Sequence, residues 1–116
     1  MAMLELNEQN FDQTIKENDF VLLDFWAAWC EPCKIFQKVV EEIAPHYPEF
    51  VFASINIEEQ PKLAQDFHIQ SVPSVMIIRS QVIVYADAGA LPTSALSDLL
   101  DQTKAIDPKD LQQEKE

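Results

Sequence analysis

Two cysteines, Cys30 and Cys33, are the residues of this chain best suited to chemistry, and they are the only cysteines among its 116 residues. They follow an apolar run, residues 20–29, that carries a single carboxylate, Asp24. A Cys-x-x-Cys pair at the junction of a strand pattern and a helix pattern indicates thiol–disulfide exchange. A disulfide between these two cysteines would close too short a loop to brace the fold. A role in redox chemistry therefore explains the two cysteines better than a structural role.

Metal binding is the competing role for two cysteines. A structural zinc ion takes four ligands, and the remaining candidates, His46 and His68, are distant in sequence and do not follow a ligand spacing. We therefore expect no metal site, and we assign both histidines to the surface or to packing.

The position of Cys30 suits an attacking thiolate. It falls just before a helix pattern opened by Pro32, where unpaired amides and the helix dipole stabilise an anion. Cys30 should be reachable from solvent, whereas Cys33, one turn further on, should be more buried and act second. The carboxylate of Glu31 beside Cys30 disfavours the thiolate, which favours the disulfide state.

Charge and composition limit the classes of partner. The chain has 20 acidic and 8 basic residues, a formal net charge of −12, which opposes binding to nucleic acid or to an anionic membrane surface. No apolar run approaches the ~20 residues of a membrane span, and the first residues lack the basic start and apolar stretch of a secretory signal. We therefore expect a cytoplasmic protein, most simply a monomer.

Hydrophobic periodicity predicts a mixed α/β sheet with helices on both faces, in the order β-α-β-α-β-α-β-β-α. Asn7 should cap a helix that buries Phe11 and Ile15, and successive strand–helix crossovers predict parallel pairing in the middle of the sheet. One domain, residues 1–107, should precede a charged, flexible tail, 108–116. The expected strands cover 4–6, 20–27, 50–57, 75–78 and 82–86, and the expected helices 8–18, 32–47, 58–67 and 92–106, the second of which should bury Ile35, Phe36, Val39, Val40, Ile43 and Tyr47.

Three segments carry a resemblance to a known family. They are Val21–Lys34, which includes Asp24-Phe25-Trp26-Ala27-Ala28-Trp29-Cys30 and Pro32-Cys33-Lys34, then Ser71-Val72-Pro73-Ser74, and finally Ala88-Gly89-Ala90. In type and spacing they resemble the thioredoxin family across nearly the whole chain. The resemblance implies the thioredoxin fold and a protein-disulfide reductase whose only redox group is a Cys30–Cys33 disulfide, with no further cofactor. It also implies disulfide-containing client proteins and a thioredoxin reductase as partners.

The resemblance also assigns roles to individual residues. Cys30 attacks the client disulfide, Cys33 resolves the mixed disulfide, and the buried carboxylate of Asp24 takes the proton from Cys33. Pro73 follows a cis peptide bond and faces the disulfide, which leaves the preceding backbone free to pair with an extended client. The rim around Cys30 that binds the client is formed by Trp29, Val72, Gly89 and Ala90.

Some positions depart from the family pattern. Glu31 stands where a glycine is usual, and with Lys34 it should tune the redox potential, giving a protein at least as reducing as ordinary members. Ser54 stands where many members carry a lysine close to the buried carboxylate, so the pKa of Asp24 should rise further. These departures leave a second class open, a thioredoxin-fold binding module or chaperone-like holder in which redox activity is secondary.

Overall fold

The computed structural model describes residues 3–107 and 109–110, and its elements follow the expected order with one added 3₁₀ turn, η1. The predicted tail, 108–116, lies outside the described residues except for 109 and 110. None of the helices in the described part of the chain has the length and apolar composition needed to cross a bilayer. The elements are β1 (Leu4–Glu5), α1 (Phe11–Glu17), β2 (Phe20–Trp26), α2 (Glu31–Ile43), η1 (Ala44–His46), β3 (Phe50–Asn56), α3 (Pro61–Asp66), β4 (Ser74–Arg79), β5 (Val82–Ala88) and α4 (Thr93–Ala105).

The five strands form one mixed sheet in the order β1-β3-β2-β4-β5. β1, β3 and β2 are parallel, whereas β4 is antiparallel to β2 and β5 is antiparallel to β4. The expected parallel pairing is therefore correct on only one side of β2. The connection from β3 to β4 contains only the six-residue α3 and does not carry the chain back along the sheet. β4 starts at the end of the sheet where β3 finishes, as its antiparallel pairing with β2 requires.

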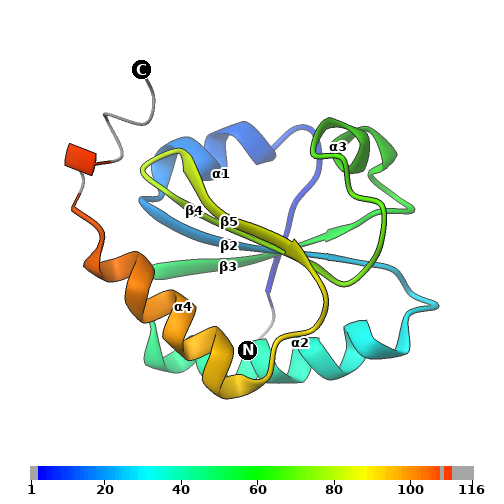
Figure 1. Cartoon of the computed structure of the whole chain (residues 1–116). Coiled ribbons are helices and arrows are strands. Elements are labelled where there is room, and N and C mark those ends of the chain that lie inside the picture. The colour runs from blue at the N-terminus through cyan, green and yellow to red at the C-terminus, as the bar shows by residue number, and fades with distance from the viewer. Residues whose placement is uncertain (1–2, 108, 111–116) are drawn as a thin grey trace.

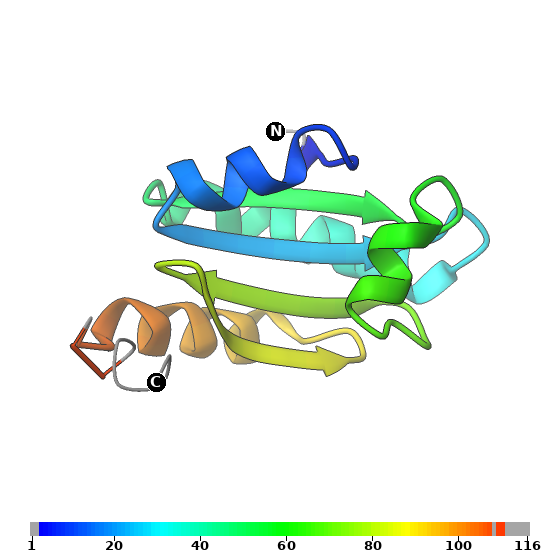
Figure 2. The ribbon, with the colours of Figure 1, turned by 90° about the horizontal axis from the view of Figure 1, so that it is seen from above.

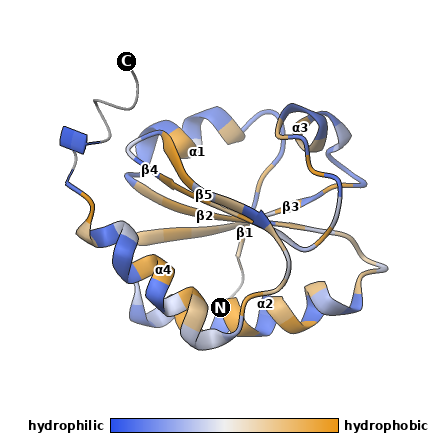
Figure 3. Cartoon of the chain, in the orientation of Figure 1, coloured by the Kyte–Doolittle hydropathy of each residue, from blue (hydrophilic) through white to orange (hydrophobic). Residues whose placement is uncertain are grey.

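Helices cover both faces of this sheet (Figure 1): α1 and α3 lie on one face, and α2 and α4 on the other. Alternation along β2 supplies both cores, because Leu22 packs on the side of α2 and α4 whereas Leu23 and Phe25 pack on the side of α1. Figure 3 shows the inner strands as predominantly hydrophobic and the helices as hydrophilic over much of their outer surface. The sequence pattern of a strand buried on both faces is confirmed for β2.

The first helix differs from the prediction both in its boundaries and in the residues that it buries. It begins at Phe11, because the side chain of Asn7 accepts hydrogen bonds from the N–H groups of Gln9 and Asn10 and forms a separate turn before α1. Thr14 is buried together with Phe11, whereas Ile15 is only half-buried. Thr14 tolerates burial because its hydroxyl donates to the carbonyl of Asn10 at 2.8 Å.

The β4–β5 hairpin turns without a glycine. Ser80 and Gln81 both adopt positive φ, 52° and 67°, which is the conformation that a two-residue hairpin turn requires at its central positions. The Ser80 N–H donates to the carbonyl of Asp19 at 2.8 Å, and the Ser80 hydroxyl donates to the Asp19 carboxylate. These tertiary contacts hold a backbone conformation that the local sequence does not favour.

Candidate functional site

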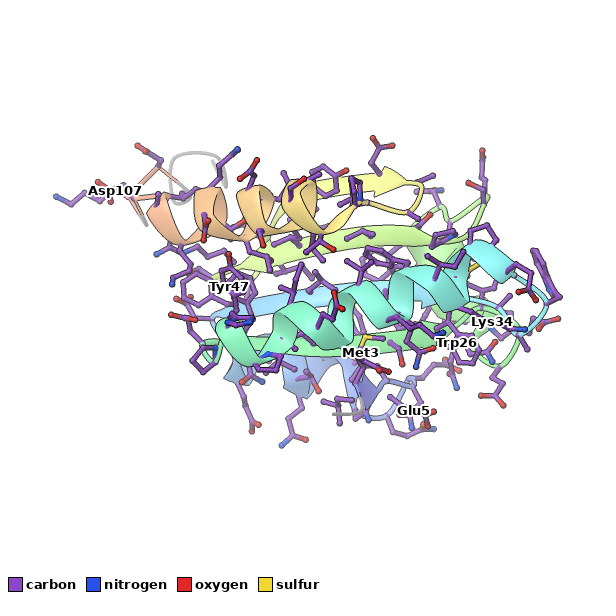
Figure 4. All side chains as sticks on the ribbon, turned by 90° about the horizontal axis from the view of Figure 1, so that it is seen from below. Met3, Glu5, Trp26, Lys34, Tyr47 and Asp107 are labelled. Atoms are coloured by element: carbon purple, nitrogen blue, oxygen red, sulfur yellow. A yellow bond between two sulfur atoms is a disulfide. The ribbon has the colours of Figure 1, made fainter. Side chains whose placement is uncertain are left out.

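The two cysteines form a disulfide where the loop after β2 enters α2, with 5.3 Å between their Cα atoms. The loop before α2, the start of α3 and the end of β5 lie at the same end of the sheet in the two views of Figure 1 and Figure 2. Figure 4 shows Trp26 and Lys34 at this end, far from Tyr47 and Asp107. We call this end, which carries the disulfide, the disulfide end of the sheet.

Cys30 is the N-cap of α2. Its Sγ accepts a hydrogen bond from the backbone N–H of Cys33 at 3.1 Å, and Pro32 occupies the first turn, where its missing N–H costs nothing. Negative charge on this sulfur would therefore meet an amide donor and the positive end of the helix dipole. The predicted position of Cys30 at a helix start is confirmed.

The burial of the two cysteines differs from the expectation. Cys30 and Cys33 each expose only 3% of their surface, so the prediction of an accessible Cys30 and a more buried Cys33 is wrong for this disulfide form. The capping interaction turns the Cys30 sulfur toward the helix, and Ala27 packs with the pair, as do the half-buried Trp26, Ile57 and Val72. Burial does not distinguish the two sulfurs here, whereas the position of Cys30 at the cap does.

Asp24 is buried on the face of β2 that α2 covers. It is 1% exposed, and its Oδ1 has no hydrogen-bond partner among the described residues. Burial raises the pKa of this carboxyl from 3.8 to about 7, as the sequence predicted in direction. The strand neighbour opposite Asp24 on β3 is Ser54, so no lysine ammonium stands at that position. A carboxyl whose pKa burial raises to about 7 thus lies on the strand leading to the disulfide.

A polar cavity of about 180 Å³ adjoins Asp24. Its lining includes Glu5, Trp26, Gln37 and Ser54, and Trp26 also presents a buried Nε1 without a partner among the described residues. Figure 4 shows the labelled Met3, Glu5 and Trp26 on the same side of the sheet. Buried polar atoms without protein partners in a space of this size favour ordered water. The cavity has room for water beside Asp24 and Trp26.

Pro73 and the loop after β5 meet beside the disulfide. The Val72–Pro73 peptide bond is cis, as the resemblance implies, and the Gly89 N–H donates to the Pro73 carbonyl at 2.8 Å. Gly89 has φ 113°, a conformation that side chains disfavour. Val72 lies outside the strands, and no backbone hydrogen bond within residues 3–107 uses its N–H or carbonyl. This backbone is free to pair with an extended segment.

The residues predicted to form an apolar rim are accessible to different degrees, and one residue of α2 that was predicted to lie in the core is exposed as well. Trp29 is 66% exposed and Ile35 is 65% exposed, while Gly89 and Ala90 are exposed and Val72 is half-buried. The interpretation of Ile35 as a buried residue of α2 is wrong. The buried positions of α2, Cys33, Phe36, Val40 and Ile43, follow spacings of three and four, and position 35 falls outside that stripe. Helical angle would have identified Ile35 as exposed.

Glu31 and Lys34 form an ion pair on the first turn of α2, with 3.0 Å between Oε1 and Nζ. Their side chains are 78% and 57% exposed, so solvent screens the pair. Each charge next to the disulfide thus offsets part of the other. As for metals, the described residues contain no group of three or more His, Cys, Asp or Glu arranged to hold an ion.

A helix-capped Cys-x-x-Cys disulfide, together with a buried carboxylate on the preceding strand and a cis-proline loop, defines a class of protein that exchanges dithiols and disulfides. Comparison with known proteins gives the family. The thioredoxin family model matches residues 2–102. A Streptomyces coelicolor protein provisionally named thioredoxin 2 is 50% identical over 106 residues, covering 91% of this chain and 79% of its own length.

Solved structures agree with the family model. A mutant thioredoxin of Halobacterium salinarum superposes with a TM-score of 0.83 at 28% identity, covering 93% of this chain and 99% of its own. A chain from the structural study of the thiol resolving mechanism in yeast mitochondrial 1-Cys peroxiredoxin via the glutathione/thioredoxin systems gives a TM-score of 0.78 at 27% identity, covering 86% and 95%. This chain belongs to the thioredoxin family. It is a thiol–disulfide oxidoreductase, a protein-disulfide reductase with the thioredoxin fold and a Cys30–Cys33 redox disulfide.

Proposed function

We propose a division of labour in which Cys30 attacks the client disulfide and Cys33 resolves the mixed disulfide. The observation that carries this proposal is the capping bond from the Cys33 N–H to the Cys30 sulfur, because it stabilises negative charge on Cys30. Pro32 contributes by fixing the first turn of α2, which holds this amide in place.

The exchange proceeds in two balanced steps. The Cys30 thiolate attacks one client sulfur, a Cys30–client disulfide forms, the client S–S bond breaks, and the other client sulfur leaves as a thiolate that takes a proton from solvent. Cys33 then loses its proton and attacks the Cys30 sulfur, which forms the Cys30–Cys33 disulfide and releases the second client thiolate. The client gains two electrons and two protons, and this chain is oxidised.

Asp24 is the proposed proton acceptor for Cys33. Its carboxyl lies on the face of the sheet beneath α2, and burial gives it a pKa of about 7, in the range that suits a general base at neutral pH. The adjoining polar cavity supports proton exchange between Asp24 and solvent.

The client segment is proposed to lie along Val72 and Pro73 as an added strand, with the free Val72 backbone supplying hydrogen bonds. Trp29, Val72, Gly89 and Ala90 would cover its apolar side chains. Clients are disulfide-bearing proteins, as with the peroxiredoxin system of the structural relative, and a thioredoxin reductase would return two electrons to the Cys30–Cys33 disulfide. Residues 1–107 would act as a single-domain monomer in the cytoplasm.

Turnover of insulin disulfides, driven by a dithiol reductant, tests the mechanism. The chain should accelerate reduction, Cys30→Ser should abolish the acceleration, and Cys33→Ser should accumulate a mixed disulfide that is visible by mass on non-reducing gels. Retained turnover in Cys30→Ser would reject the assignment. It would favour the second candidate, a binding module that uses the exposed Trp29 and the rest of the apolar rim to hold unfolded chains.

A further inference from the structure

A second hollow, of about 270 Å³, lies between the α3–β4 loop and the end of β5. Part of its lining is apolar, from Phe67, Ile69 and Met76, and part is polar, from Ser71 and Asp87. Asp87 is the only acidic side chain in the lining, which also includes His68 but no Lys or Arg. The hollow thus combines apolar walls with a single carboxylate, a combination that suits a long side chain with a cationic end.

This hollow lies directly beside the proposed client strand. Ser71 and Ser74, which line it, flank Val72 and Pro73 in sequence. Asp87 stands two residues before Gly89, whose N–H holds the Pro73 carbonyl. In an added strand, alternate side chains point to the same face, so one side chain close to the client cysteine would face the hollow.

The Asp87 carboxylate keeps an oxygen for a ligand. Oδ1 accepts a hydrogen bond from the Ala88 N–H at 2.8 Å, and no hydrogen bond among residues 3–107 uses Oδ2. Asp87 and Ala88 are exposed at the end of β5, so a side chain entering from solvent reaches this carboxylate without displacing a core residue.

Charge around the disulfide is predominantly negative. The four segments at this end of the sheet, residues 29–34, 57–62, 70–74 and 86–91, hold four carboxylates, those of Glu31, Glu58, Glu59 and Asp87, and two basic side chains, Lys34 and Lys62, of which Lys62 lies 3.9 Å from the Glu8 carboxylate. Lys34 is engaged with Glu31 at 3.0 Å. Surface charges of one sign attract oppositely charged partners and speed their encounter.

We propose that this hollow is a subsite for a Lys or Arg side chain of the client next to its disulfide, with Asp87 as the specificity-determining residue. This inference rests on the proposed mode of client binding along Val72 and Pro73. The methylene stem would pack on Phe67, Ile69 and Met76, and the cationic head would meet the free oxygen of Asp87. The preferred substrates are then disulfides in basic sequence surroundings.

Three disulfide peptides that differ only in flanking residues test the subsite: one with Lys on both sides of each cysteine, one with Ser and one with Glu. At low salt, kcat/KM should be about tenfold higher for the Lys peptide than for the Glu peptide, and added salt should reduce the ratio. Asp87→Asn should lower this ratio several-fold, and Asp87→Lys should invert it. Both variants should reduce the Ser peptide at the wild-type rate.

Glu17→Gln provides the matched control, because Glu17 ends α1 just before β2 begins, at the opposite end of the sheet, and the change removes the same charge. This control should leave the Lys-to-Glu ratio unchanged. Equal reduction of all three peptides, or an equal effect of Glu17→Gln and Asp87→Asn, would overturn the subsite while leaving the disulfide reductase intact. Failure to reduce even the Ser peptide would overturn the proposed function together with the inference.

Discussion

The two ends of the sheet differ in how completely their polar groups are paired. At the disulfide end, Asp24 Oδ1 and Trp26 Nε1 are buried without partners in the described part of the chain, the Val72 backbone is unpaired there, and Trp29 is exposed. At the other end, the Tyr47 hydroxyl donates to the Asp101 carboxylate at 2.7 Å, and Lys104 and Glu49 form an ion pair at 3.0 Å. Of the three buried side-chain polar atoms without a partner in the described residues, two thus lie at the disulfide end and one, Arg79 Nε, at the other end.

Arg79 is the centre of the opposite end. It is 7% exposed, and its Nη1 donates to the carbonyls of Thr103, at 2.9 Å, and Ile106, while its guanidinium lies 4.9 Å from the ring centre of Phe20. Its Nε is buried without a partner in the described residues. Arg79 thus ties the last turn of α4 to β4 and β2. We therefore expect this end to stabilise the fold, and we expect the unpartnered buried groups at the disulfide end to cost stability.

The largest expected effect follows from neutralising the unpartnered carboxylate. Asp24→Asn should raise the free energy of unfolding of the oxidised protein by roughly 4 kcal/mol above pH 7, because a pKa raised from 3.8 to about 7 penalises the charged form in the folded state alone. The wild type binds more protons folded than unfolded between these values, so its stability falls as pH rises through them. Urea unfolding of both proteins at pH 3 and pH 9 measures the difference in their free energies of unfolding. At pH 3 this difference should disappear.

The same substitution should slow catalysis. Removing the base should slow resolution of the mixed disulfide by about 10² or more at pH 8, the lower range for a general base. The wild-type rate should fall as pH drops through about 7, where Asp24 becomes protonated, and Asp24→Asn should lack this step. Stopped-flow decay of a purified Cys30–client disulfide provides the measurement. An identical pH profile in both proteins would remove Asp24 from the mechanism.

At the opposite end the sign of the effect should reverse. Arg79→Met should lower the free energy of unfolding by about 2–3 kcal/mol, because the carbonyls of Thr103 and Ile106 lose a charged donor. Turnover per folded molecule should be unchanged. Lys104→Met, which removes an exposed ion pair with Glu49, is the control and should change stability little. A large loss of turnover in folded Arg79→Met would show that the two ends are coupled.

The smallest effect concerns the charges flanking the disulfide. Glu31→Gln should make the reduction potential less negative, because a thiolate next to a neutral residue is more stable, and Lys34→Gln should make it more negative. Each shift should stay below about 30 mV, a tenfold change in the exchange equilibrium, because both side chains are exposed. Equilibration with a glutathione buffer measures both. Shifts in the same direction would contradict an electrostatic origin.

Much of this architecture could be predicted from local pattern. The apolar run with Asp24, the Cys-x-x-Cys pair and the stripe of α2 define β2, α2 and their junction, because each depends on neighbours in sequence. The antiparallel pairing of β4 could not be predicted in the same way. It depends on the path of residues 57–73 between β3 and β4, in which the helix α3 covers Pro61–Asp66 and not the predicted 58–67.

Side-chain environment was harder to predict than element type. The exposure of Ile35 follows from helical angle and could have been derived, whereas the equal burial of Cys30 and Cys33 depends on Ile57 and Val72, which arrive from distant parts of the chain. The positive φ of Ser80 and Gln81 is likewise held by Asp19, a partner that is far away in sequence. Such features cannot be predicted from local sequence, because they depend on contacts that exist only in the assembled fold.

The two edge strands of the sheet differ in length, and this difference affects self-association. β1 has only two residues and offers little template for another strand, whereas β5 has seven and pairs with β4 on one side. The register shift that sets Ile77 opposite Tyr85 and Ile78 opposite Ile83 leaves Val84 as an extra residue in β5. Irregularities of this kind bend an unpaired border and hinder the growth of intermolecular sheets. At high concentration this irregularity should protect the chain from aggregation by pairing of edge strands between molecules.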